Sequence, residues 1–179
     1  ALTNAGGVKC WGFNNHGQIG DNSTETRKTP VAVVGLTSGV RAIAAGADHT
    51  CALTDTDGVK CWGLNTDGQL GDNSTTEHHT PVNVVGLTGG VAAIALGRNH
   101  TCASPDAGGV KCWGDNADSQ LGDTSTDDRH TPVAVSGLAG SVAAVSPDWN
   151  HTFVLTNAAA VRFCGGTSPG QLGDAFVPN

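Results

Sequence analysis

The sequence predicts an all-β fold of β-propeller-type blades, each built from four antiparallel strands. Three observations predict it: a repeat with a constant period of 51 residues, short apolar runs bounded by glycine, and no helical periodicity. The repeat is clearest in the Q-(I/L)-G-D sequences that begin at Gln18, Gln69, Gln120 and Gln171. A chain of 179 residues holds about 3.5 repeats, so we expect an incomplete ring unless it is assembled or belongs to a longer chain.

The repeat at residues 40–90 predicts its strands in order. Residues 40–45 form a short apolar run between two glycines, and we expect an inner strand that is buried on both faces. Residues 50–53 and 59–62 predict a hairpin, because the sequence T-D-T-D-G between them has turn chemistry.

A polar loop and an edge strand complete the repeat. Residues 65–80 are rich in Asn, Asp, Gly, Ser and Thr and predict a surface loop, as do residues 14–29 and 116–131. Residues 80–85 begin with T-P-V and predict the fourth strand. Proline has no N–H to give to a ladder, so this strand is expected at a sheet edge.

The period divides the chain into a partial blade at 1–39, complete blades at 40–90 and 91–141, and a partial blade at 142–179. The first part is expected to lack an inner strand and the last to lack the T-P-V strand. Both would leave unpaired strand edges, which invite association. We expect either a fragment of a longer array or ends that complete each other between subunits.

The motifs resemble the regulator-of-chromosome-condensation type propeller repeat, in a bacterial or secreted variant with disulfides. The resemblance rests on H-T-C-A-L at 49–53, G-V-K-C-W-G at 58–63 and G-Q-L-G at 68–71, with equivalents along the whole chain. It implies blades that usually close a ring of seven, with structural roles for Trp11, Trp62 and Trp113. The nucleotide-exchange activity of that family is not implied, because no repeat shows the inserted loops and basic residues it needs.

Cysteine spacing predicts two disulfides. Cys51 and Cys61 flank the hairpin turn, and Cys102 and Cys112 repeat the arrangement. In an antiparallel hairpin such residues lie opposite each other, where their sulfurs can bond. In the last repeat both positions become phenylalanine together, Phe153 and Phe163, as expected of side chains that touch.

Two further cysteines have no partner in register. Cys10 would pair with a residue one position before Ala1, and Cys164 stands at a tryptophan position. We expect Cys10 to be bonded to residues upstream, to another subunit, or free. A bond between Cys10 and Cys164 across a ring or subunit contact is a further alternative.

Composition excludes some partners. The net charge is −7 and the nine Lys and Arg residues are scattered, so neither nucleic acid nor an anionic membrane is expected as a partner. No apolar run is long enough to span a bilayer. The opening residues A-L-T-N lack an initiating Met and the regions of a signal peptide, which predicts a processed or partial product.

Three repeated histidines do not predict a catalytic or metal site. They are His49, His100 and His151, and each is followed by threonine at the start of a predicted strand. Histidine is a common base and metal ligand, but these three belong to different blades. We therefore expect a repeated structural hydrogen bond rather than a catalytic or metal site.

Other candidate motifs are weak. The D-x-D-G and N-x-D-G sequences at 55–58 and 65–68 lack the remaining ligands of a calcium loop, and no C-x-x-C zinc spacing or G-x-S-x-G elbow occurs. We expect no catalytic residue, metal or cofactor. Four N-glycosylation patterns occur: Asn22 and Asn73 lie in predicted exposed loops, whereas Asn99 and Asn150 adjoin predicted strands.

These observations favour a non-enzymatic, extracytoplasmic module with a structural or protein-binding role, one form of which is self-assembly into an oligomer or filament. The expected partner is a second copy of the chain or another protein, at the cell surface or outside the cell. The alternative is a secreted inhibitor or other protein binder, or a carbohydrate-binding propeller. That alternative predicts exposed aromatic anchors, and the sequence offers Phe13 alone near such a position.

Overall fold

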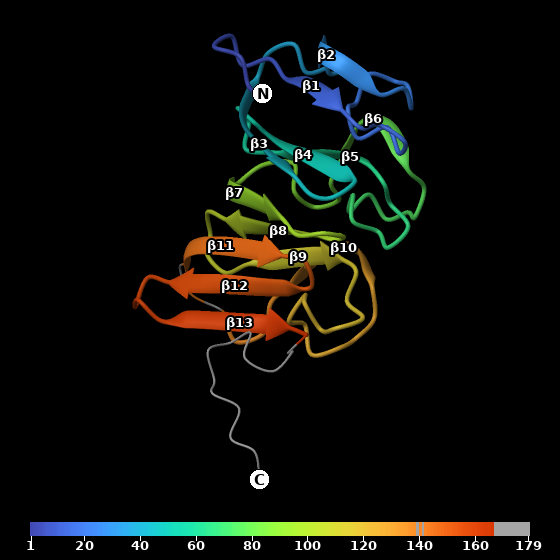
Figure 1. The fold of residues 1–179 in the computed structure, drawn as a ribbon. Helices are drawn as coiled ribbons and strands as arrows, with labels where there is room; N and C mark the ends of the chain where they lie inside the picture. Colours follow the sequence, from blue (N-terminus) through green and yellow to red (C-terminus); the bar gives the residue numbers. More distant parts are fainter. Residues whose placement is uncertain (139, 141, 167–179) are drawn as a thin grey trace.

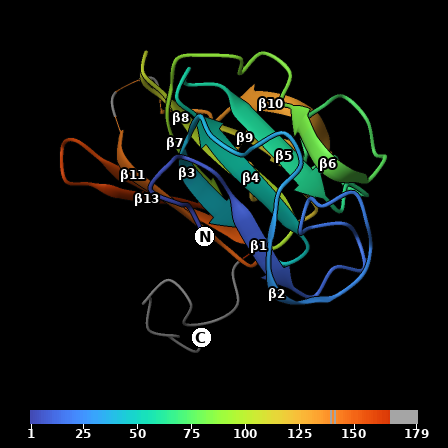
Figure 2. The same ribbon diagram turned by 90° about the horizontal axis from the view of Figure 1, so that it is seen from above.

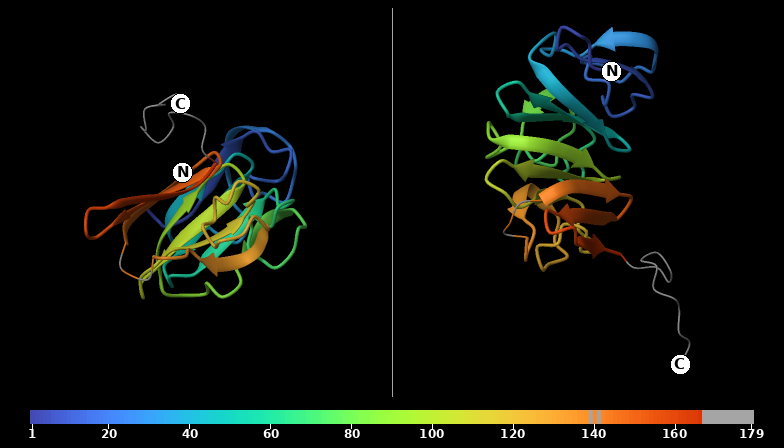
Figure 3. Two further views of the ribbon diagram at one scale, coloured as in Figure 1. Left: turned by 90° about the horizontal axis from the view of Figure 1, so that it is seen from below. Right: turned by 90° about the vertical axis from the view of Figure 1, so that its left-hand side faces the viewer.

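The computed structural model describes residues 1–138, 140 and 142–166 and is all-β (Figure 1). These residues form thirteen strands and no helix. The strands belong to four antiparallel sheets, which we call blades 1 to 4 in chain order. The blades stack one after another, with blade 1 at one end of the molecule and blade 4 at the other (Figure 3). The predicted fold class is confirmed.

The strands follow the repeat. Blade 1 contains β1 (Lys9–Gly12) and β2 (Arg27–Ala32), and blade 2 contains β3 (Val40–Ala45), β4 (His49–Thr54), β5 (Val59–Gly63) and β6 (His78–Asn83). Blade 3 contains β7 (Val91–Leu96), β8 (His100–Pro105), β9 (Lys111–Gly114) and β10 (Arg129–Ala134). Blade 4, within the described residues, contains β11 (Val142–Asp148), β12 (His151–Thr156) and β13 (Val161–Gly165).

Strand register repeats from blade to blade. Cys51 lies opposite Cys61, Cys102 opposite Cys112, and Phe153 opposite Phe163. In blade 1 the same hairpin is represented by a bridge between Leu2 and Val8. A constant register places equivalent side chains on the same side of every blade.

The inner strands are more exposed than the sequence analysis predicts. Only Val40 is fully buried in β3, whereas the rest of the strand is partly or fully exposed. β7 packs against both β3 and β11 along the inner side of the stack (Figure 2). Because four blades form only part of a ring, the inner strands line an open surface rather than an enclosed core.

The outer strand of blade 2 begins two residues before its predicted start. β6 covers His78–Asn83 instead of residues 80–85, and it contains Pro81 at the sheet edge as expected. The proline is tolerated because the other side of this strand has no ladder partner in the sheet.

The apolar core lies between blades. One cluster joins Leu53 and Val59 of blade 2 to Trp113 of blade 3, and another joins Val8 and Val33 to Trp62. Trp62 and Trp113 have no exposed surface. Each tryptophan therefore packs against the blade that precedes its own.

Candidate functional site

The turns between the first two strands of blades 2, 3 and 4 form one surface. Their residues, 46–48, 97–99 and 149–150, come directly before the repeated His-Thr pair. Backbone hydrogen bonds join neighbouring turns: Ala47 N–H donates to Arg98 O and Arg98 N–H to Trp149 O, both at 3.3 Å. We call this surface the turn face.

A hydrogen-bond relay supports the turn face from below. His49 Nε2 lies 2.8 Å from Thr101 Oγ1, and that hydroxyl donates to Gln69 O at 2.9 Å. The hydroxyl has one proton, which goes to the carbonyl, so His49 must donate from Nε2. The same relay recurs one blade later through His100, Thr152 and Gln120.

Burial keeps the relay histidines neutral. It lowers the pKa of His49 to about 3 and that of His100 to about 4, so both are uncharged at neutral pH. Their Nδ1 atoms are buried without a hydrogen-bond partner among the described residues. The third histidine, His151, is partly buried and stacks on Phe153 with ring centroids 6.2 Å apart. The arrangement suits structural hydrogen bonding rather than proton transfer.

The tips of two turns bring a cation and an aromatic ring together. Arg98 Cζ lies 4.2 Å from the ring centroid of Trp149, within the range of a cation–π interaction. Trp149 nevertheless remains 58% exposed. A cavity of about 260 Å³ beside the pair is lined by the turn residues Gly46, Ala47 and Gly97 and by strand residues that include Leu96 and Pro147.

Sequence reasoning missed this pair. The tip position is Ala47, Arg98 and Trp149 in successive blades, whereas the His-Thr pair after it is constant. The sequence signal for the pair is a position that varies inside a segment that is otherwise repeated. The fold shared by the blades does not require the side chains at this position, so they are free to serve a function.

The polar loops are anchored by buried asparagines, which the sequence analysis also missed. Asn65 Oδ1 accepts from Leu70 N–H at 2.9 Å, and its Nδ2 donates to Ser74 O and Thr76 O at 3.1 and 2.9 Å. Asn14 and Asn116 make the equivalent bonds in their own loops. All three asparagines have no exposed surface. Their constant spacing is the sequence signal for this role.

The predicted cysteine pairs form disulfides, Cys51–Cys61 and Cys102–Cys112. Cys10 and Cys164 are free and partly buried, and burial raises the pKa of both thiols. They belong to β1 and β13 at opposite ends of the stack, so one chain does not join them (Figure 1).

The predicted tryptophan and glycosylation residues divide by exposure. Trp11 is 51% exposed although Trp62 and Trp113 are buried, because none of the described residues forms a blade in front of blade 1.

Of the residues in N-glycosylation patterns, Asn22 and Asn73 are exposed, whereas Asn99 and Asn150 are partly buried.

The described residues contain neither a candidate metal site nor a helix that could span a membrane. Across the part of the chain that the structure describes, no group of His, Cys, Asp or Glu side chains has a metal-binding arrangement. The same residues contain no helix with the length and apolarity needed to cross a bilayer.

Comparison with known proteins identifies the repeat. The family profile described as regulator of chromosome condensation (RCC1) repeat matches residues 5–53, 58–104 and 107–155. The ultraviolet-B receptor UVR8 of Arabidopsis thaliana is 32% identical over 178 residues, which cover 97% of this chain and 40% of the receptor. The probable E3 ubiquitin-protein ligase HERC4 of Homo sapiens is 40% identical over 185 residues, covering 100% of this chain and 17% of the ligase.

Solved structures show the same fold. Human WBSCR16 superimposes with a TM-score of 0.79 at 27% identity, covering 92% of this chain and 44% of that one. Prp20p of Saccharomyces cerevisiae has a TM-score of 0.81 at 24% identity, with coverages of 98% and 45%. This chain therefore spans less than half the length of each of these proteins.

Proposed function

Because the chain belongs to the regulator of chromosome condensation (RCC1) repeat family, we propose that it is a non-enzymatic protein-interaction module whose turn face binds a partner. The observation that carries the proposal is the exposed Trp149 ring, held against Arg98 beside a cavity. Tryptophan and arginine dominate the binding energy of many protein interfaces.

The frame under the turn face reduces the entropic cost of binding. The turns are joined to one another by backbone hydrogen bonds and rest on the His49 and His100 relays. A surface that is already ordered loses little conformational freedom when a partner docks. This is the advantage of placing variable residues on a rigid scaffold.

Two relatives support a binding role rather than a shared reaction. One is named as a receptor and the other as a probable ubiquitin ligase, and each is much longer than the region it shares with this chain. Different activities built around one repeat are expected when the repeat supplies a scaffold. In this chain the buried His49 and His100, with their lowered pKa values, are poorly placed to act as bases, which favours a role without catalysis.

We also propose an extracytoplasmic location. The support is the pair of disulfides, because such bonds persist mainly in oxidising compartments. The relatives named above come from a plant and from human, and they do not address a bacterial or secreted variant. Mass analysis of the protein from its natural source, alkylated before and after reduction, tests the location. Four protected thiols support it, and a fully reduced protein overturns it.

The turn face can be tested by comparing the proteins captured by two immobilised variants. Trp149→Ala should reduce capture of the partner about tenfold, whereas Val85→Ala should not. Val85 is the matched control because it is an exposed apolar residue outside the turn face. Circular dichroism verifies that both variants fold. Equal capture by the two variants would overturn the turn face as the binding surface.

A carbohydrate ligand is the second candidate, favoured by the same exposed tryptophan. The apolar face of an indole ring can stack on the C–H groups of a sugar. Arg98 covers one side of Trp149, which leaves one side for a sugar. Quenching of tryptophan fluorescence by oligosaccharides, lost in Trp149→Ala, would favour this candidate over a protein partner.

We further propose that a second copy of the chain is one of the partners. The support is the exposed Trp149 of the turn face, because an exposed aromatic side chain can anchor a second copy as well as another protein. Sedimentation velocity of the wild-type chain tests this proposal, and a monomer at all concentrations overturns it.

A further inference from the structure

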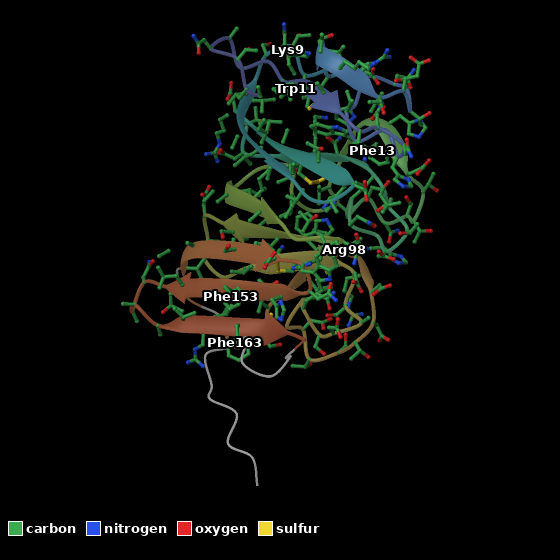
Figure 4. The ribbon with its side chains drawn as sticks, viewed as in Figure 1. Lys9, Trp11, Phe13, Arg98, Phe153 and Phe163 are labelled. Atoms are coloured by element: carbon green, nitrogen blue, oxygen red, sulfur yellow. A yellow bond between two sulfur atoms is a disulfide. The ribbon has the colours of Figure 1, made fainter. Side chains whose placement is uncertain are left out.

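A cavity of about 190 Å³ lies between blades 3 and 4, and we call it the boundary cavity. Blade 3 and its loop form one wall, which includes Gly122 and Val135. The other wall is formed by β12 and β13 and includes Val154 and Cys164. The label of Phe163, another lining residue, marks β13 in Figure 4.

The equivalent space between blades 2 and 3 is filled by an indole ring. Trp113 has no exposed surface, and its indole N–H donates to Gln69 O at 3.0 Å. A Cβ atom at Gly71 would lie 2.6 Å from Trp113 Nε1, so this glycine leaves the room that the ring needs. Gly20 and Trp62 repeat the arrangement between blades 1 and 2.

The boundary of blades 3 and 4 keeps this frame but not the ring. Gln120 and Gly122 occupy the same repeat positions as in the preceding boundary, whereas the tryptophan position is Cys164. Val154 replaces Ala103 of blade 3 and fills only part of the space that the indole would take. Because the frame is the same, the replacement of a large ring by a thiol accounts for the cavity.

The hydrogen bonds at the frame carbonyl differ as well. Gln69 O accepts from a threonine hydroxyl and from an indole N–H. Gln120 O accepts from the Thr152 hydroxyl at 2.8 Å and from Cys164 Sγ at 3.2 Å. A thiol is a weak donor, so this carbonyl has room for a stronger donor in place of the thiol.

The lining of the boundary cavity favours a neutral ligand. Its apolar side chains include Val135, Leu138 and Val154. Arg162 is the one charged side chain among the lining residues, and it is exposed. An ionised group placed deep in the cavity would lose its hydration without an ion-pair partner.

We propose that the boundary cavity binds a small, neutral, planar aromatic molecule with an N–H group, which takes the place of the missing indole side chain. The ring would lie between the two walls, and its N–H would donate to Gln120 O. An apolar cavity of about 150 Å³ takes up benzene, so the larger boundary cavity has room for a ring system with a donor. The turn face contributes no residue to this cavity, so the inference is independent of the proposed function.

Indole is the probe, because it is the group that the preceding boundaries hold in this place. Titration of the isotope-labelled protein with indole should shift the amide NMR signals of Gly122 and Val154. For a ligand of this size we expect a dissociation constant on the order of 1 mM. Benzofuran has the same shape with an oxygen atom in place of the N–H, and it should bind about fivefold more weakly.

Variants at Cys164 test whether the boundary cavity is the site. Cys164→Trp fills the cavity and should abolish the indole-induced shifts, and Cys164→Leu is a second filling variant without a new N–H. Cys164→Ala widens the cavity and removes the competing thiol, so it should bind indole about threefold more tightly. Cys10→Ala is the matched control, with the same substitution at the other free cysteine, and should bind like the wild type. Thermal unfolding verifies the fold of each variant.

The outcomes decide both parts of the inference. Shifts that are confined to blades 3 and 4 and lost in the filling variants support the site. Absence of these shifts in the wild type, or undiminished binding by the filling variants, overturns it. Equal affinity for indole and benzofuran overturns the hydrogen bond to Gln120 O.

Discussion

His49 donates a hydrogen bond from Nε2 to Thr101 Oγ1 at 2.8 Å, across the boundary between blades 2 and 3. The two residues are 52 positions apart, one repeat plus one residue. The Thr101 hydroxyl in turn donates a hydrogen bond to Gln69 O at 2.9 Å. The Trp113 indole N–H donates to the same carbonyl at 3.0 Å. Two side chains of blade 3 therefore converge on one carbonyl of the loop of blade 2 and fix the angle at which the blades meet.

Thr101→Val is expected to destabilise the fold by about 2 kcal/mol, because it removes the hydroxyl and leaves a buried N–H donor of His49 unpaired. The side chains have similar shapes, so packing changes little. Urea unfolding followed by tryptophan fluorescence measures the loss. Thr75→Val, at an exposed loop position, is the control and should unfold like the wild type. Equal stability of both variants would contradict the relay.

Stability should fall as the pH is lowered from about 6.5 toward 4. Burial holds the pKa of His49 at about 3 and that of His100 at about 4, below the ordinary value of 6.5. In this window the unfolded chain binds protons that the folded chain does not, so acid favours unfolding. Each histidine contributes a slope of at most about 1.4 kcal/mol per pH unit.

His100→Gln isolates this effect. Glutamine can still donate to Thr152 but does not titrate, so the variant should lose one histidine's share of the slope. Urea unfolding at several pH values between 7 and 4.5 gives the slope for each protein. An unchanged slope would show that His100 titrates normally in the folded state. Proton NMR of the wild-type imidazole signals provides an independent reading.

Removal of one disulfide should cost about 2 to 3 kcal/mol, because each closes a short loop in the unfolded chain. The variant Cys51→Ala/Cys61→Ala tests it, compared with the wild type with and without dithiothreitol. A chain in which all four paired cysteines are alanine is the control and should be insensitive to the reductant. If reduction of the wild type leaves its urea midpoint unchanged, the bonds do not stabilise the fold.

The repeat made the strands and the pairs of Cys51 with Cys61 and Cys102 with Cys112 predictable, because register follows from a constant period and a hairpin turn. The same reasoning failed for β3, whose exposure depends on the number of blades present. It also missed Trp149, since the repeat predicts neighbouring turns but not that the Arg98 and Trp149 side chains stack on each other. Periodicity predicts what the blades share, and the candidate site is formed by the residues in which they differ.

Cys164 occupies the position that Trp62 and Trp113 hold in the preceding blades, and its Sγ donates to Gln120 O at 3.2 Å. A cavity of about 190 Å³ lies beside it, lined in part by Gly122, Val135 and Val154. The equivalent glycine of blade 2, Gly71, leaves the space into which the Trp113 indole fits. Gly122 leaves the same space at the boundary of blades 3 and 4.

Cys164→Trp should therefore stabilise the protein by about 1 kcal/mol, since the indole fills the cavity and its N–H donates to Gln120 O. Differential scanning calorimetry should record a higher Tm. Cys164→Ser separates the effect of filling from the effect of losing a thiol, because serine has nearly the same size and leaves the cavity empty; it should not raise the Tm. A lower Tm for the tryptophan variant would mean that blade 4 cannot adopt the spacing of blades 2 and 3, and that its contact with blade 3 is already close-packed around the cysteine.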